Sequence, residues 1–399
     1  MTRIDTHEPT LSNSPTVGMV LRRNAHAHPD KPLLIHDAER LTYGDAERRS
    51  SRLARGLVAL GAGKGTHVGL LYPNGAQFVV GMLAAARIGA VVVPLSIFGT
   101  AGELREQMVH SDIHMLLGTA SHHSHDYVQR LAEVPAGAEF DAVGRLYCAD
   151  VPQLRLVAID GGSAHSSYVR DTGDLDRHAG TVDDELFDAL EDDVHGSDPL
   201  AIVYTSGSTG GFAGVVHTHA GLLNHQRDLN EFRGLTADDI LFRDAPFFRI
   251  GGFAFGLLAA LVAGSTLLCP SMPAERQAAD QPDVPGTAEA GSVVLLSGDQ
   301  SEQPEPDEGS SGTPGPGLQT RIVDPDTGAP VAVGEIGELC FRGPSVMQGY
   351  YRRSREQSFD PDGWFHTGNP ARTDGEFVHF ADWGDANLAP VAAEKVFDA

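Results

Sequence analysis

Lysine is scarce in this sequence of 399 residues, and positive charge is scarce overall. The only lysines are Lys31, Lys64 and Lys395, so any mechanism that needs a lysine must use one of these three. Lysine and arginine together number 29 against 54 acidic residues, which gives a formal net charge of −25. Nucleic acids and anionic membranes repel so negative a chain, and we expect neither as a partner.

Cysteine and long apolar runs are also scarce. The three cysteines, Cys148, Cys269 and Cys340, are far apart and odd in number, which predicts neither a disulfide framework nor a cysteine-based metal site. No apolar run is long enough for a membrane helix, and residues 1–30 lack the apolar core of a signal peptide. These absences predict a cytoplasmic protein without a membrane span.

The residues that are present predict a layered α/β fold. A chain of this length with 41% hydrophobic residues can bury a large core and form two or more subdomains. Val68–Tyr72 and Ala90–Leu95 have the apolar character of buried strands, and Ala76–Ile88 between them has that of a helix. A strand, a helix and a second strand in this order predict a parallel pair covered by the helix. Further helices are expected over 46–60, 220–232 and 253–261.

One stretch, residues 200–219, carries the clearest functional signal. It begins as a β-branched apolar run and becomes a turn rich in serine, threonine and glycine. Backbone N–H groups and hydroxyls in such a turn suit phosphate oxygens, although an ordinary polar loop is the alternative. The candidate phosphate-binding residues are Thr205, Ser206, Gly207, Ser208, Thr209 and Gly210.

Tyr204–Gly210, followed by Gly214 and Val215, resembles the phosphate loop of the adenylate-forming superfamily, the acyl-CoA synthetases and their relatives. That loop continues with proline and lysine, whereas this chain has Phe212 and Ala213. The lysine places a point charge on a phosphate, and alanine cannot do so. The resemblance therefore implies a phosphate site that lacks its cation.

The resemblance extends over most of the chain and implies its division into domains. Residues 15–270 look like the α/β N-terminal region of the acyl-CoA synthetases, and residues 315–380 like their small β-subdomain. Between them, 275–314 is acidic and rich in proline and glycine, which predicts a linker. Residues 381–399 look like a remnant of the hinge and the start of the C-terminal domain, and we expect the rest of that lid domain, with its catalytic lysine, to be absent.

Several site residues follow from the same resemblance. Asn369 stands where the family has an aspartate that grips the ribose hydroxyls, and an amide lacks the charge of a carboxylate. Phe248, Arg249 and Gly252 lie in the segment that borders the family's acyl pocket. Nothing matches the motif whose glutamate holds magnesium, and Trp383 replaces the hinge arginine. We assign no catalytic residue and no metal ligand.

Two functions from different classes remain open. The resemblance implies a ligase that uses ATP, Mg²⁺ and coenzyme A to convert a carboxylic acid to acyl-AMP and then acyl-CoA, here with weak or lost activity, or with a lid supplied by a partner protein. The alternative is a non-catalytic pseudoenzyme that binds a nucleotide or acyl group, or a regulatory protein. A metallohydrolase built on His217 and His219 ranks below both, because residues two apart do not share a helix face.

Overall fold

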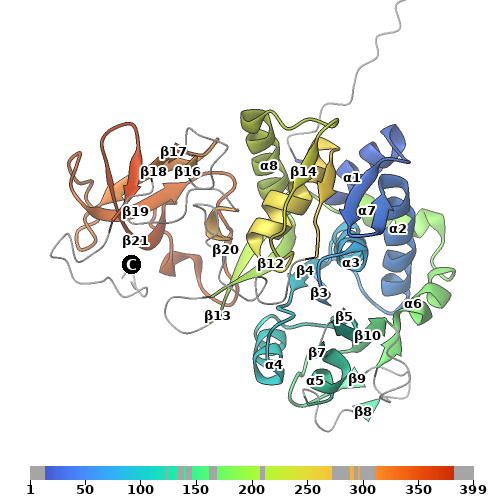
Figure 1. Ribbon diagram of the computed structural model, residues 1–399. Helices are drawn as coiled ribbons and strands as arrows, with labels where there is room; N and C mark the ends of the chain where they lie inside the picture. Colours follow the sequence, from blue (N-terminus) through green and yellow to red (C-terminus); the bar gives the residue numbers. More distant parts are fainter. Residues whose placement is uncertain are drawn as a thin grey trace, which may run out of the picture.

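The computed structural model describes residues 14–122, 125–133, 139–140, 146–160, 169–206, 212–271, 288–291, 295–296 and 311–381. Two parts lie side by side in Figure 1: a large α/β part, coloured blue to yellow, and a smaller β-rich part in orange and red. Among these residues, no helix combines the length and the apolar character needed to cross a bilayer.

An eight-stranded sheet organises the α/β part, with the strand order β11-β10-β5-β3-β4-β12-β13-β20. Neighbours from β11 to β12 pair in parallel, and β13 and β20 add two antiparallel partners at one edge. The strands are β3 (His67–Leu71), β4 (Val91–Pro94), β5 (Met115–Thr119), β10 (Leu156–Asp160), β11 (Arg170–Asp171), β12 (Pro199–Ser206), β13 (Phe212–Thr218) and β20 (Gly349–Tyr350). The parallel order confirms the strand pairing expected from the sequence.

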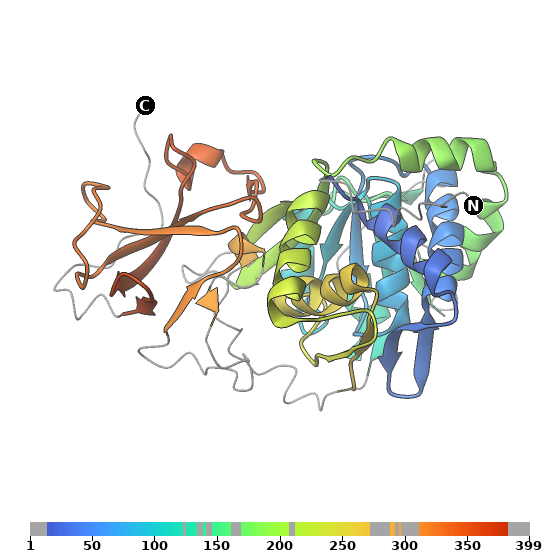
Figure 2. The same cartoon turned by 90° about the horizontal axis from the view of Figure 1, so that it is seen from above.

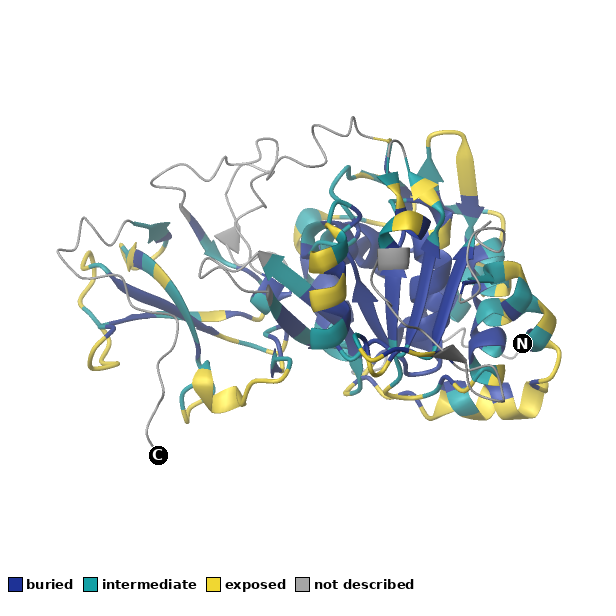
Figure 3. Ribbon diagram, turned by 90° about the horizontal axis from the view of Figure 1, so that it is seen from below, coloured by how far each residue is buried: buried dark blue, intermediate teal, exposed yellow. Residues whose placement is uncertain are grey.

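Apolar layers cover both faces of this sheet. Successive side chains point to opposite faces of a strand, so Leu70 joins one buried cluster and Leu71 the other. On the first face lies α3 (Ala76–Arg87), whose residues are nearly all buried. The central strands are dark blue in Figure 3, and exposed residues lie on the helices and loops around them. Burial on both faces explains why these strands read as continuous apolar runs.

Helices pack around the sheet, as Figure 2 shows from above. Short polar side chains cap several of their N-termini: the Thr100 hydroxyl and the Glu103 carboxylate form a capping box, and Thr218 caps α8. The other helical segments are α1 (Val17–Ala27), α2 (Tyr43–Ala59), α4 (Ala101–His110), α5 (Tyr127–Glu133), α6 (Thr172–Ala179), α7 (Asp184–Asp192), α8 (His219–Arg233), the π-helix η1 (Gly251–Leu258) and α9 (Ala259–Ala263). The expected helix over 253–261 is thus two consecutive segments, η1 and α9.

A second sheet of the α/β part has the order β14-β15-β1-β2. Its strands are β1 (Pro32–His36), β2 (Glu39–Thr42), β14 (Ile240–Phe242) and β15 (Thr266–Leu268). β1 and β15 pair in parallel although more than two hundred residues separate them. Two short hairpins, β6 (Ser121–His122) with β7 (His125–Asp126) and β8 (Glu139–Phe140) with β9 (Leu146–Tyr147), complete this part.

The β-rich part is one antiparallel sheet with the order β16-β17-β22-β21-β19-β18. Its strands are β16 (Leu295–Leu296), β17 (Ser311–Pro314), β18 (Gln319–Val323), β19 (Gly337–Arg342), β21 (Phe365–Thr373) and β22 (Val378–Phe380), with a 3₁₀ turn, η3 (Arg355–Gln357), between β20 and β21. The α/β class with a small β-rich subdomain is therefore confirmed.

The domain boundaries stay predictions. Much of the predicted linker lies outside the described residues, and its described pieces are η2 (Ala288–Ala290), β16 and β17. β20 belongs by sequence to the predicted β-subdomain, yet it pairs with β13 of the large sheet, Val215 opposite Tyr350 and Val216 opposite Gly349. This strand joins the two parts beside the central stretch of the sequence (Figure 1).

Candidate functional site

The central stretch forms a hairpin, β12 and β13, between the parallel strands and β20. The pairing runs without interruption from Ala201 opposite His217 to Ser206 opposite Phe212, with Thr205 opposite Ala213. Gly214 is required here, because a Cβ atom at this position would lie 2.8 Å from the Ile202 side chain. The two ends of the predicted phosphate loop therefore belong to one hydrogen-bonded pair of strands.

Tyr204 ties this hairpin to α4. Its hydroxyl lies 2.8 Å from Nδ1 of His110 and donates to the Gln107 carbonyl at 3.4 Å. Burial lowers the pKa of His110, which favours the neutral imidazole beside the phenol. Of the predicted phosphate-binding residues, Gly207, Ser208, Thr209 and Gly210 lie outside the described residues, as does the Ser206 side chain. Their role stays a prediction.

Asn369 lies on a bulge of β21. Between the pairs Cys340–His366 and Glu338–Pro370, β21 advances four residues while β19 advances two. The additional residues cannot pair with β19 and bulge away from it, with Gly368 at a φ of +71°. Asn369 is exposed there, as a residue that contacts a ligand must be. Asn369 and the hairpin lie in different sheets, and β20 connects the two sheets.

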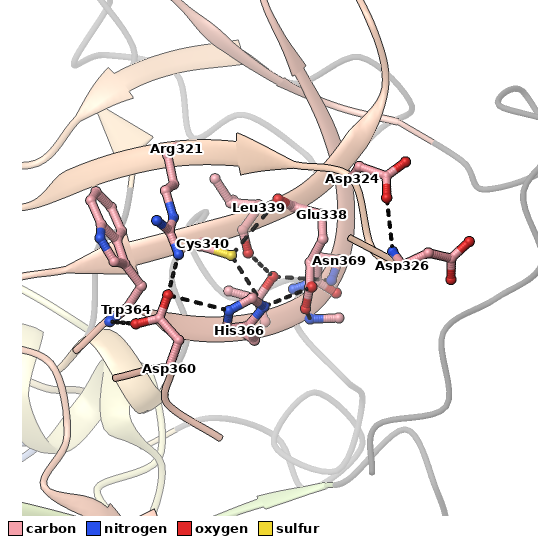
Figure 4. Close-up of polar contacts among 12 residues, drawn as sticks. Arg321, Asp324, Asp326, Glu338, Leu339, Cys340, Asp360, Trp364, His366 and Asn369 are labelled. Carbon is pink, nitrogen blue, oxygen red and sulfur yellow. Dashed lines mark hydrogen bonds and ion pairs between the residues drawn. The ribbon is translucent and has the colours of Figure 1, made fainter. Parts of the chain in front are cut away.

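Glu338 holds this bulge in place, a role that the sequence did not reveal (Figure 4). Its carboxylate is buried, and Oε1 accepts a hydrogen bond from the Gly368 N–H at 2.9 Å. Oε2 lies 2.9 Å from Nδ1 of His366. The Thr367 hydroxyl donates to the Leu339 carbonyl at 2.7 Å and accepts from the Asn369 N–H at 3.0 Å. Every residue of the bulge is thus fixed by a hydrogen bond.

The predicted acyl segment is anchored to the turn after β3. The Asn74 amide donates to the Ala245 carbonyl at 3.0 Å and accepts from the Phe247 N–H at 2.8 Å. Gly252 is the second residue of the π-helix, where a Cβ atom would lie 2.2 Å from the Pro246 carbonyl oxygen, so the position needs glycine for close packing. Phe248 and Arg249 are half-buried beside it, and the Phe248 ring packs edge-on against Phe98. Contact of Phe248, Arg249 and Gly252 with an acyl group stays a prediction.

His217 and His219 have structural partners. Nε2 of His217 lies 2.6 Å from the Ala288 carbonyl oxygen, and Nδ1 of His219 accepts from the Val17 N–H at 3.2 Å. Both rings are buried, and desolvation lowers both pKa values to about 4. Within the described residues, neither histidine belongs to a cluster of three metal-ligating side chains. They pack the hairpin against α1 and η2.

A sequence profile of the AMP-binding enzyme family matches residues 21–284 and 283–351. The chain belongs to this family. It is 25% identical to YngI of Bacillus subtilis, a candidate acyl-CoA synthetase by name, over 90% of this chain and 77% of that protein. It is 26% identical to 4-coumarate-CoA ligase 1 of Narcissus pseudonarcissus, over 87% of this chain and 71% of the relative.

Solved structures of acyl-CoA ligases share this fold. The crystal structure of a long-chain-fatty-acid-CoA ligase, FadD1, from Archaeoglobus fulgidus superimposes with a TM-score of 0.72 at 19% identity. The superposition covers 95% of this chain and 86% of that structure. An acid substrate fits the ligases of the AMP-binding family, and these ligases use ATP, Mg²⁺ and coenzyme A in general.

The described residues fit these ligands only in part. Asn369 and Thr205 offer neutral hydrogen-bonding groups of the kind that ribose hydroxyls require. Position 213, beside the loop, is an alanine and provides no cation for a phosphate. Contact of Asn369 and Thr205 with a nucleotide stays a prediction, and we derive no reaction step through magnesium.

Proposed function

We propose that this chain binds an adenine nucleotide and activates carboxylic acids weakly at most. The observation that carries the proposal is Asn369, an exposed neutral amide on a bulge that a buried network holds rigid. Because the backbone at Asn369 is held by these hydrogen bonds, its amide is positioned to contact a ribose hydroxyl, with a weaker hydrogen bond than a carboxylate would make. A charge-assisted hydrogen bond is roughly twice as strong as a neutral one, so the amide costs affinity without abolishing it.

Adenylation needs more than a bound nucleotide. When a carboxylate attacks the α-phosphate and pyrophosphate leaves, negative charge collects on the phosphate oxygens, and cations stabilise that charge. Alanine at position 213 cannot contribute to this stabilisation. Removal of one such contact costs about 3–4 kcal/mol in the transition state, which is a rate loss of about 10²–10³. This argument favours a binding protein over an efficient ligase.

The deciding experiment measures pyrophosphate release by the purified chain with ATP, Mg²⁺ and a panel of carboxylic acids, with and without coenzyme A. We expect release near background for every acid. Ala213→Lys alone will not restore turnover, because catalytic groups act together and restoring one does not compensate for the absence of the others. Robust turnover by the unmodified chain would refute weak activation and would require a cation that the sequence did not reveal.

Nucleotide binding has a separate test. Asn369→Asp should tighten AMP binding about fivefold to tenfold in calorimetry, because the carboxylate forms charge-assisted hydrogen bonds with ribose. Asn224→Asp on α8 adds the same charge elsewhere and should leave the affinity unchanged. Equal affinities for the unmodified chain and Asn369→Asp would remove Asn369 from the nucleotide site.

A further inference from the structure

Three metal-ligating side chains meet on one face of the β-rich sheet. Glu338 and Cys340 are two apart on β19 and therefore face the same side. His366 on β21 lies directly opposite Cys340 in the register. One donor atom from each of the three residues lies within 4.8 Å of the others, and Figure 4 shows the side chains converging.

We propose that Glu338, Cys340 and His366 form a zinc-binding site, with a water molecule as the fourth ligand. This site is distinct from the phosphate loop, and the proposal does not rest on nucleotide binding. A thiolate and an imidazole favour zinc over magnesium or calcium, which prefer oxygen ligands. One thiolate and one carboxylate also balance the charge of Zn²⁺, which suits a buried position.

The donor spacing is close to that of a tetrahedral zinc site. Normal Zn–S and Zn–N bonds place sulfur and nitrogen about 3.6 Å apart, and Nδ1 of His366 lies 3.5 Å from Sγ of Cys340. Nitrogen and carboxylate oxygen should be about 3.4 Å apart, whereas Nδ1 and Oε2 of Glu338 are 2.9 Å apart, within hydrogen-bonding distance. A metal ion would replace this hydrogen bond with a separation only a few tenths of an ångström wider.

Neighbouring groups already orient the ligands. Oε1 of Glu338 is occupied by the Gly368 N–H, which leaves Oε2 to bind a metal. Nε2 of His366 faces Oδ2 of Asp360 at 3.8 Å, and Asp360 is held by Arg321 and by the Trp364 N–H. A carboxylate behind the imidazole is the usual second-shell partner of a zinc-binding histidine. These contacts favour coordination through Nδ1.

The test uses Co²⁺ as a spectroscopic probe for zinc on the reduced, chelator-treated full chain. We expect one Co²⁺ per chain, visible d–d bands of tetrahedral geometry and a thiolate-to-cobalt charge-transfer band, all displaced by Zn²⁺. Cys340→Ser should abolish the charge-transfer band, and Asp360→Asn should weaken binding about tenfold. Cys148→Ser is the matched control, because Cys148 is also a buried free thiol but lies in the α/β part, and it should retain the band.

Two outcomes would overturn the site. One is a reduced, folded chain that shows no charge-transfer band, and the other is a band that survives Cys340→Ser. If Cys340→Ser does not fold, the melting temperature of the unmodified chain decides, because a metal that binds only the folded state raises it. An unchanged melting temperature at saturating Zn²⁺ would then refute the proposal.

Discussion

The two parts of the molecule surround a buried carboxylate in different ways. In the α/β part, Glu191 of α7 is bound by two arginines, Arg22 of α1 and Arg87 of α3. Arg87 is itself buried and also contacts Glu47 of α2 at 2.6 Å. Ion pairs thus connect four helices.

In the β-rich part, Glu338 instead accepts hydrogen bonds from a backbone N–H and lies against an imidazole. These contacts join no helices and hold only the bulge that carries Asn369. Glu191 therefore serves the stability of the fold, whereas Glu338 serves the position of one exposed side chain. The following changes test that distinction, from the largest expected effect to the smallest.

Arg87→Ala should cause the largest loss of stability. It leaves Glu191 and Glu47 without their shared guanidinium, and removal of one partner of a buried ion pair costs about 3–5 kcal/mol. Urea unfolding followed by circular dichroism measures the loss. Arg48→Ala removes an exposed pair with Asp45 and should cost less than about 1 kcal/mol. Equal losses of stability for the two variants would show that the buried ion pairs stabilise the fold no more than an exposed pair does.

Acid should destabilise the α/β part through His217. Its folded pKa of about 4 lies below the usual 6.5, so the unfolded chain binds more protons between these values. Its contribution is complete above pH 6.5 and is lost as the pH falls toward 4, on the order of 3 kcal/mol in all. His217→Gln should flatten this part of the pH profile of unfolding. His26→Gln, at an exposed position, should leave the profile unchanged.

Glu338→Gln should cost about 1.5–3 kcal/mol, because it removes the charge from two buried hydrogen bonds. The unfolding measurement needs a chelator, so that a bound metal does not add to the difference in stability between the two chains. If the carboxylate serves mainly to position the bulge, Glu338→Gln should also weaken AMP binding, whereas Arg87→Ala should not while the chain remains folded. Weaker AMP binding by Arg87→Ala together with unchanged binding by Glu338→Gln would contradict these two roles.

Tyr351→Phe should have the smallest effect, about 1 kcal/mol. The Tyr351 hydroxyl donates to Asp112 at 2.8 Å and helps to fasten the chain after β20 to the end of α4. Thermal unfolding with Tyr147→Phe, an exposed tyrosine, as the control isolates this hydrogen bond. No difference between the two variants would mean that this hydrogen bond adds nothing to the attachment of the two parts.

Apolar patterning within the sequence determined the core of the α/β part. The runs at Val68–Tyr72 and Ala90–Leu95 predicted buried strands because a strand covered on both faces needs apolar side chains at every position. The motif at Tyr204–Gly210 led to the AMP-binding family, and the family profile confirmed it. Asn369 was predicted in the same way, by its place in a motif, and its contact with a nucleotide stays a prediction.

Only the tertiary structure decided how distant polar residues combine. Glu338 and His366 are 28 positions apart, and no local periodicity records that the register of β19 against β21 brings them together. The sequence likewise left the role of His217 open, and its burial against η2 settled it. The physical reason is common to both cases: local propensity and hydrophobic period act over a few neighbouring residues, whereas strand register is set by the packing of the whole sheet.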